Sequence, residues 1–173
     1  MKKIIVIGCP GSGKTTFAEK LNHRTGLPLY YLDAIWHKPD KTHIPREEFD
    51  ARLAEILALD AWIIDGNYNR TLPKRLEYCD TVIYLDFSRF ACLMGVAKRI
   101  LTTYGTVRPD MGEGCPERFD WEFLQWVWNF NKNHRERYYR LLNETDGIEK
   151  IVLKNRRAVK EFLKRMEEGD YNG

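Results

Sequence analysis

The sequence G-C-P-G-S-G-K-T, residues 8–15, decides the fold of this chain. It fits the pattern G-x-x-x-x-G-K-[ST], with Gly8, Gly13, Lys14 and Thr15 at the fixed positions. In this pattern the backbone N–H groups of the loop surround phosphate oxygens at the positive end of a helix. The lysine lies against the β- and γ-phosphates, and the hydroxyl coordinates Mg²⁺. The stretch therefore predicts a binding site for a nucleoside triphosphate.

The residues on either side of the loop predict a strand before it and a helix after it. Residues 4–7, I-I-V-I, form the β-branched run typical of a buried strand. Phe17, Ala18 and Leu21 recur at helical spacing, and Gly26 is a typical helix stop. We expect the nucleotide to contact the following loop residues: Gly8, Gly11, Ser12, Gly13, Lys14, Thr15 and Thr16.

The length and composition indicate one soluble globular domain over residues 1–173, with 43% hydrophobic and 31% charged residues. The net charge of +3 is too small to argue for a polyanion partner, although it does not exclude one. No apolar run approaches a membrane span, and the short run after Lys3 leads into the loop rather than into a cleavage site. These features predict a cytoplasmic protein that makes no membrane contact. The four cysteines form no C-x-x-C pair, which argues against a zinc site and a disulfide framework: Cys9, Cys79, Cys92 and Cys115.

The remaining sequence alternates strand and helix patterns. Further strands are predicted over residues 27–33, 61–66, 80–87 and 148–154, and further helices over 46–59, 71–78, 90–104, 121–142 and 156–167. Residues 34–45 are predicted to form a loop over one sheet edge. This alternation predicts a three-layer α/β/α sandwich around a five-stranded parallel sheet. Ligands bind beyond the carboxyl ends of such strands, where the following residues are expected to converge: Gly8, Asp33, Asp65 and Asn155.

Residues 105–120 interrupt the alternation with three glycines and two prolines. They also contain Arg108 and Arg118, whose guanidinium groups can each hold two phosphate oxygens. This composition suits a lid that closes over the phosphates better than a core element.

Three segments resemble the adenylate kinase-like group of phosphate-loop proteins. They are the loop at 8–15, the run I-I-D-G-N-Y-N-R-T-L-P at 63–73, which is similar to D-G-F-P-R-T of adenylate kinases, and the arginine-bearing lid. A closer resemblance, over nearly the whole chain, is to the bacterial FlaR-like "topology modulation" proteins. It rests on R-P-D-M-G-E-G-C-P-E-R-F-D at 108–120 and W-V-W-N-F at 126–130. Asn67-Tyr68-Asn69 replaces the Phe-Pro of adenylate kinases, which weakens the case for AMP as the acceptor.

The resemblance implies a kinase that uses ATP and Mg²⁺ to phosphorylate a small acceptor, namely a nucleoside, a nucleotide or another small alcohol. It implies that Arg70 and Gly66 face the acceptor and that Arg99 lies on the adenine and phosphate side. Arg135 or Arg137 would meet the lid arginines, and Asn155 with Arg156 would edge the adenine pocket. About half of the six arginines 70, 99, 108, 118, 135 and 137 are expected to be solvated surface charges instead.

Two aspartates compete for the metal. Asp65 and Asp86 both follow apolar strands, and a strand-end carboxylate together with Thr15 is what Mg²⁺ requires. We favour Asp65, because D-G-N-Y-N-R matches the kinase pattern, whereas Asp86 reads as a helix cap or a loop charge.

Asp33 is the candidate for the acceptor hydroxyl. Its carboxylate would hold that hydroxyl and take its proton, or would alternatively cap the next turn. Trp36 would stack on a ring of the acceptor or pack beneath the lid. Trp121, Phe123, Trp126, Trp128 and Phe130 occur at nearly every second position of one helix, so most are expected to serve core and hinge packing.

A competing hypothesis is an ATP-binding regulator of DNA topology or transcription without a small-molecule substrate. The basic cluster between Lys154 and Arg165 would be its surface, although a solvated helix face is the preferred interpretation. No helix-turn-helix, zinc finger or second domain supports the regulator. N-K-N-H at 131–134 matches the guanine-reading N-K-x-D only in its first two residues, so ATP is the expected donor. A monomer or a homodimer fits the sequence equally.

Overall fold

The computed structural model describes residues 1–38, 40, 42–103 and 120–167. Its centre is a parallel five-stranded sheet with the strand order β2-β3-β1-β4-β5. The strands are β1 (Lys3–Gly8), β2 (Leu29–Tyr31), β3 (Trp62–Asp65), β4 (Thr81–Leu85) and β5 (Glu149–Leu153). The predicted five-stranded parallel sheet is therefore confirmed.

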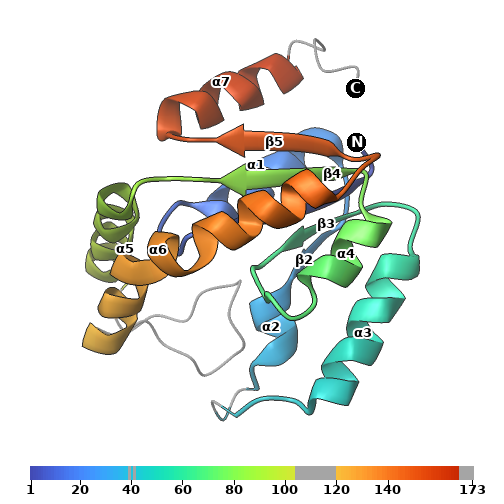
Figure 1. Ribbon diagram of the computed structural model, residues 1–173, viewed down its shortest axis with the longest axis horizontal. Coiled ribbons are helices and arrows are strands. Elements are labelled where there is room, and N and C mark those ends of the chain that lie inside the picture. The colour runs from blue at the N-terminus through green and yellow to red at the C-terminus, as the bar shows by residue number, and fades with distance from the viewer. Residues whose placement is uncertain (39, 41, 104–119, 168–173) are drawn as a thin grey trace.

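Helices cover both faces of the sheet. They are α1 (Lys14–Thr25), α2 (Leu32–Trp36), α3 (Arg46–Ala58), α4 (Leu72–Tyr78), α5 (Arg89–Thr103), α6 (Trp121–Glu144) and α7 (Arg156–Glu167). Figure 1 shows α4 and α6 in front of the sheet and α1 behind it. The rings of Phe17 and Phe162, 5.9 Å apart, join α1 to α7, while Tyr84 of β4 meets Tyr138 of α6.

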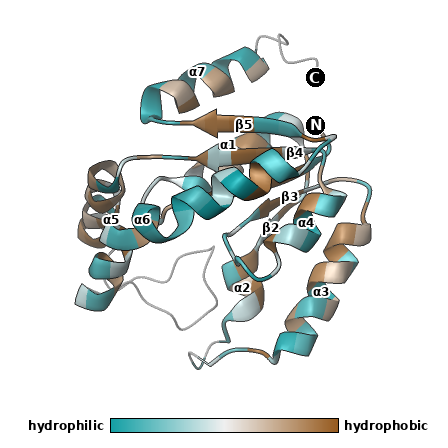
Figure 2. Ribbon diagram, in the orientation of Figure 1, coloured by the Kyte–Doolittle hydropathy of each residue, from teal (hydrophilic) through white to brown (hydrophobic). Residues whose placement is uncertain are grey.

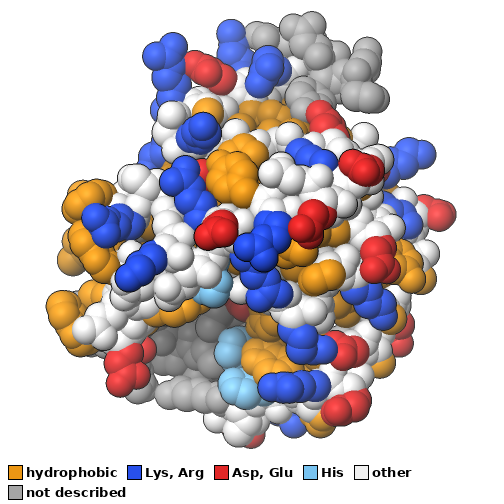
Figure 3. Space-filling view, viewed as in Figure 1, with side chains coloured by type: hydrophobic (Ala, Val, Ile, Leu, Met, Phe, Trp, Pro, Cys, Tyr) orange, Lys and Arg blue, Asp and Glu red, His pale blue; other side chains and the backbone are white. Residues whose placement is uncertain are grey.

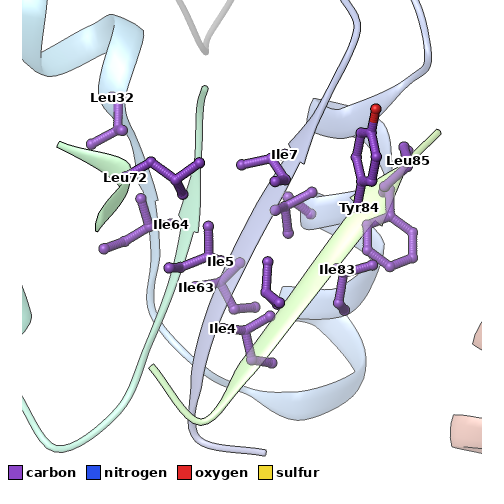
Figure 4. Packing of buried hydrophobic residues seen from close by; sticks show 14 of the residues in the cluster. Ile4, Ile5, Ile7, Leu32, Ile63, Ile64, Leu72, Ile83, Tyr84 and Leu85 are labelled. Atoms are coloured by element: carbon purple, nitrogen blue, oxygen red, sulfur yellow. The ribbon is translucent and has the colours of Figure 1, made fainter. Parts of the chain in front are cut away.

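The core lies on both sides of β1. Residues 4–7 are fully buried, because neighbouring strands flank β1 and helices cover its two faces. Figure 4 shows these isoleucines beside Ile63, Ile64 and Ile83 of the adjacent strands. Burying each such side chain stabilises the fold by roughly 1.5–3 kcal/mol. Figure 2 shows the resulting contrast between hydrophobic strands and the mainly hydrophilic outer side of α6.

The predicted strand at 27–33 is two residues too long at each end. Strand β2 ends at Tyr31, and the chain turns at once into α2, where the carbonyl of Asp33 accepts a hydrogen bond from the N–H of His37 at 3.0 Å. The turn buries Leu32 completely, next to Gly66. The loop predicted over 34–45 thus begins as a helix, because burial of Leu32 outweighs the strand preference of the segment.

The register brings the carboxyl ends of the strands together. Asp65 at the end of β3 lies opposite Tyr31 of β2 and Val6 of β1, and Gly8 lies opposite Leu85 of β4. The predicted lid falls outside the described residues, except for Asp120, whose carboxylate caps α6 by accepting from the N–H of Phe123 at 3.1 Å. Within the described residues, no helix has both the length and the apolar composition of a membrane span.

Candidate active site

A cavity of about 1090 Å³ lies beyond the carboxyl ends of the strands. Figure 3 shows a hollow in the surface with histidine side chains at its rim. The cavity is lined by the glycine loop at residues 8–15, by α1, α2, α5, α6 and α7, and by residues 65–69. One site therefore combines side chains from almost the whole length of the chain.

The glycine loop at residues 8–15 joins β1 to α1 and lines the cavity. Gly13 has a φ of 91°, in the left-handed region that favours glycine, and it precedes the first turn of α1. The N–H of Ser12 donates to the carbonyl of Cys9 at 3.1 Å, and Lys14 Nζ donates to the same carbonyl at 3.3 Å. The following predicted nucleotide contacts line the cavity: Gly11, Ser12, Gly13, Lys14, Thr15 and Thr16.

Gly8 and Asn67 tie the start of the loop to the end of β3. The N–H of Gly8 donates to Asn67 Oδ1 at 3.0 Å, and Asn67 Nδ2 donates to the carbonyl of Gly8 at 2.9 Å. Gly8 itself does not line the cavity; a Cβ on it would lie 2.6 Å from the carbonyl oxygen of Leu85. In the sequence, Asn67 stood out only because it departs from the adenylate kinase pattern. The structure shows that its side-chain amide binds the backbone of Gly8 and so fixes the start of the loop.

Gly11 in the loop packs directly against Gly95 in α5. A Cβ on Gly95 would lie 1.9 Å from the carbonyl oxygen of Gly11, and a Cβ on Gly11 would lie 2.1 Å from that of Cys92. Both neighbours are backbone atoms, which cannot move without moving the loop or the helix. Sequence reasoning missed Gly95, because only the tertiary structure brings α5 against the loop.

We expect Gly95→Ala to destabilise the protein and to weaken ATP binding by about 10-fold or more. Helix propensity alone would make this exchange stabilising by ~0.5–1 kcal/mol, so destabilisation would identify the clash with the loop. Thermal melting and calorimetric titration with ATP measure the two effects. Met94→Ala, at an exposed position of the same helix, is the control. A Gly95→Ala protein that is more stable and binds ATP normally would contradict the assigned contact.

Thr15, at the start of α1, contacts Asp65, at the end of β3. Thr15 Oγ1 donates to Asp65 Oδ2 at 3.0 Å, and the carboxylate of Asp65 is nearly buried, with 6% of the residue exposed. Both residues line the cavity. A hydroxyl and a carboxylate at a strand end next to the phosphate loop are oxygen ligands that suit Mg²⁺.

Asp86 lies elsewhere and has other partners. It does not line the cavity, and its Oδ2 accepts from Arg135 Nη2 at 2.7 Å and from the hydroxyl of Tyr139 at 2.8 Å. The carboxylate of Asp86 raises the pKa of Arg135. Arg135, predicted to face the phosphates, is placed outside the cavity lining by this ion pair.

The two carboxylates should respond differently to substitution. Asp65→Asn is expected to lower turnover of ATP most strongly at limiting Mg²⁺, because a charged oxygen ligand is lost. Asp86→Asn is expected to lower the melting temperature, since it removes the charge of a buried carboxylate that binds half-exposed Arg135, while leaving the Mg²⁺ requirement unchanged. Turnover against Mg²⁺ concentration measures the first effect and thermal melting the second. The reverse pattern would assign the metal to Asp86.

Asp33 lines the cavity from α2, which lies on the side of the molecule away from α7 (Figure 1). Its Oδ1 accepts from the hydroxyl of Tyr68 at 2.9 Å, and the ring of Tyr68 stacks on Phe49 with centroids 5.1 Å apart. Burial, followed by the charge of Asp33, raises the pKa of Tyr68, so the hydroxyl stays protonated. Trp36 does not line the cavity, because its ring packs on His43 at 5.0 Å.

The predicted arginines fall into two groups. Arg99 and Arg156 line the cavity, whereas Arg70 lies outside the lining and forms two hydrogen bonds to Asp50 at 2.8 and 2.7 Å. Arg137 donates to the carbonyl of Asn69 at 3.2 Å. Asn155 is not in the lining, and its Oδ1 caps α7 by accepting from the N–H of Ala158 at 2.9 Å. Arg108 and Arg118 lie outside the described residues.

Three aromatic residues of α6, namely Phe123, Trp126 and Phe130, line the cavity. Core and hinge packing was expected for most of the aromatic run, and Phe130 is indeed buried in the core while Phe123 packs against it. The spacing of the three, at three and four residues, places them on one helix face. That spacing could have identified the three cavity residues from the sequence. Trp121 and Trp128, both of which are exposed, interrupt the pattern.

Two histidines in the cavity were also missed. His37 follows α2 and His134 lies in α6, and burial lowers the pKa of each imidazole. Their rings are therefore neutral at pH 7. Nδ1 of His134 lies 3.2 Å from Nδ2 of Asn69, whose Oδ1 accepts from the hydroxyl of Tyr138 at 2.8 Å. No short motif signals His134, since its contact with Asn69 joins segments more than 60 positions apart.

Comparisons with known proteins support the fold. No protein-family model matches the sequence, and no curated protein matches it. The structure is similar to that of a protein from Chloroflexus aurantiacus described as a "putative kinase", with a TM-score of 0.56, 18% identity and coverage of 95% of this chain and 96% of the other. It is also similar to shikimate kinase from Bacteroides thetaiotaomicron, with a TM-score of 0.59, 14% identity and 95% coverage of both chains. The chain therefore has the three-layer α/β/α fold of the phosphate-loop kinases.

Proposed function

We propose that this protein is an ATP- and Mg²⁺-dependent kinase that transfers the γ-phosphoryl group to a small acceptor. The observation that carries the proposal is the contact between Thr15 and Asp65, 3.0 Å long, beside a glycine loop and within one cavity that also contains Asp33. A metal-binding pair, a phosphate cradle and a carboxylate for the acceptor are the parts that phosphoryl transfer needs. The kinase folds of the two similar structures support the same proposal.

Positive side chains gather at the nucleotide end of the cavity. They come from the loop, α1, α5 and α7, and they are Lys14, Lys20, Lys98, Arg99, Arg156 and Lys160. They would neutralise the triphosphate, whose charge spreads over the equatorial oxygens during transfer. The ring of Phe123, 5.5 Å from the Arg99 guanidinium carbon, would hold that guanidinium against the nucleotide.

Thr15 and Asp65 would hold Mg²⁺ beside the loop. The metal supplies charge neutralisation at the β- and γ-phosphates. The protein itself contributes mainly position, because in-line transfer requires the acceptor oxygen about 3–3.5 Å from phosphorus. Asp33 would orient that oxygen from the far side of the cavity.

The experiment that tests this function is a transfer assay with purified protein, ATP and Mg²⁺. ADP release is followed across nucleosides, nucleotides and small alcohols, and the new phosphate ester is identified by mass spectrometry. We expect Mg²⁺-dependent transfer that chelation abolishes. Failure to bind ATP in a folded protein would overturn the proposal.

The finer family relationship is a further part of the proposal. The run at 108–120 supports a relationship to the FlaR-like topology modulation proteins. Salt-dependent binding of DNA by the purified protein, without acceptor phosphorylation, would favour the regulator instead.

A further inference from the structure

The two ends of the cavity differ in charge. The lining lysines and arginines among the described residues belong to the loop, α1, α5 and α7. The other end is lined by the carboxylate of Asp33 and by neutral polar groups, namely His37, Tyr68, Asn69 and His134. An anionic acceptor would therefore meet the charge of Asp33, and no lysine or arginine of the described residues lines this end. Arg137 lies nearby, outside the lining, where it donates to the carbonyl of Asn69 at 3.2 Å.

Arg70 and Arg75 are the two arginines that follow residues 65–69 in the sequence. Both form hydrogen bonds to other protein groups. Both nitrogens Nη1 and Nη2 of Arg70 bind the carboxylate of Asp50, outside the cavity lining. Arg75 is fully buried in α4, where it donates to the carbonyls of Gly66 at 3.0 Å and of Asn67. Arg75 thus holds the backbone of the loop after β3, and it does not line the cavity.

Asn69 sets the hydrogen-bonding character of His134. Its Oδ1 accepts from Tyr138, so its Nδ2 faces the imidazole, and an amide nitrogen can only donate. Nδ1 of His134 is then the acceptor, and the proton of the neutral ring is on Nε2. His134 therefore has one N–H to offer in the cavity that it lines.

The carboxylate of Asp33 can accept a hydrogen bond from a hydroxyl group. Tyr68 donates to Oδ1, while Oδ2 has no hydrogen-bond partner among the described residues. Oδ2 can accept the hydrogen bond of an alcohol, and the hydrogen bond from Tyr68 fixes the direction of the carboxylate.

We propose that the acceptor is an uncharged alcohol whose hydroxyl binds Asp33 and whose second polar atom accepts from His134. A nucleoside, with a ring nitrogen or carbonyl besides its hydroxyls, belongs to this class. This inference rests on the proposed kinase function and narrows its substrate. The aromatic side chains of Phe130 and Trp126 would cover an apolar face of such a molecule.

The reaction balances with ATP as the only co-reactant. The hydroxyl oxygen forms a bond to the γ-phosphorus, and the bond from that phosphorus to the β,γ-bridging oxygen breaks. ADP leaves with the electron pair, and the hydroxyl proton passes to Asp33. The product is a phosphate monoester of the alcohol.

The first test compares matched acceptors that differ by one charged group. Adenosine, guanosine, cytidine, uridine and ribose are assayed beside analogues that keep every hydroxyl and carry one added carboxylate, with ATP and Mg²⁺. At least one uncharged member is expected to be phosphorylated with a kcat/KM at least about 10-fold above that of its partner. Preference for the charged members, or no transfer to any uncharged member, overturns this acceptor class. Calorimetric titration of ATP in the same samples separates this failure from failure of the kinase proposal.

The second test concerns His134. His134→Phe removes the N–H and is expected to raise KM for the uncharged acceptor by about 10-fold, the scale of one lost hydrogen bond. His134→Gln retains an N–H donor and should restore most of the affinity. His23→Phe, at an exposed position of α1, is the control. Equal KM values in His134→Phe, in His134→Gln and in the unaltered protein would overturn the assigned contact.

Discussion

Lys14→Ala is expected to lower kcat for phosphoryl transfer by about 10²–10³-fold and to weaken ATP binding. Lys14 lines the cavity, and its Nζ donates to the carbonyl of Cys9 at 3.3 Å. The positive charge of Lys14 can reach the β- and γ-phosphates once this one hydrogen bond is broken. Steady-state assays with saturating acceptor and calorimetric titration with ATP measure the two losses.

The control for Lys14 is a lysine of equal charge at a site outside the cavity. Lys150→Ala, at an exposed position of β5, should leave both parameters unchanged. The melting temperature of Lys14→Ala should stay close to that of the unaltered protein, because the side chain makes a single hydrogen bond to the loop among those described. A folded Lys14→Ala protein with full turnover would refute the nucleotide site at residues 8–15.

Asp33→Asn is expected to lower kcat by about 10²-fold, the lower range for a lost general base. Affinity for ATP should stay within a few-fold, since Asp33 lies at the other end of the cavity from the cationic side chains. An amide can still hold the acceptor hydroxyl, but it cannot take the proton. The measurement is kcat with the phosphorylated acceptor, together with the ATP dissociation constant.

Tyr68→Phe separates the effect of the Asp33 carboxylate from the effect of the hydrogen bond that Tyr68 donates to it. It keeps the ring that stacks on Phe49 and removes the hydroxyl that donates to Asp33. We expect a decrease in kcat of about 10-fold or less, because the carboxylate stays and only its orientation loosens. Asp60→Asn, at an exposed position, is the control for Asp33. Full kcat in Asp33→Asn would make Asp33 a structural residue and remove the hydroxyl-acceptor proposal.

The two similar structures bear on the fold and leave the acceptor open. Both are below 20% identity, so their acceptor sites give no information about this chain. Arg70 illustrates the point. Its resemblance to the adenylate kinase arginine placed it at the acceptor, whereas its pairing with Asp50 directs it to the surface.

The sequence by itself determined the features that depend on neighbouring residues. The glycine loop with Lys14 and Thr15, the buried run of β1 and the helix that ends at Gly26 are local patterns, each encoded within about ten positions. The alternation of strands and helices then led to the parallel sheet, because parallel strands require crossover helices. Strand-end residues such as Asp65 could be assigned to one edge on the same ground.

Only the tertiary structure decided which of the polar side chains face the cavity. Asp65 and Asp86 both follow apolar strands, and only a resemblance to the kinase pattern favoured Asp65. The structure adds that Arg135 and Tyr139 of α6 bind Asp86, which does not line the cavity. Likewise Gly95 and His134 acquire their roles from contacts with Gly11 and Asn69, far away in the chain. Such roles depend on where a side chain's partner lies in space, and a single sequence contains no local pattern for a distance between remote segments.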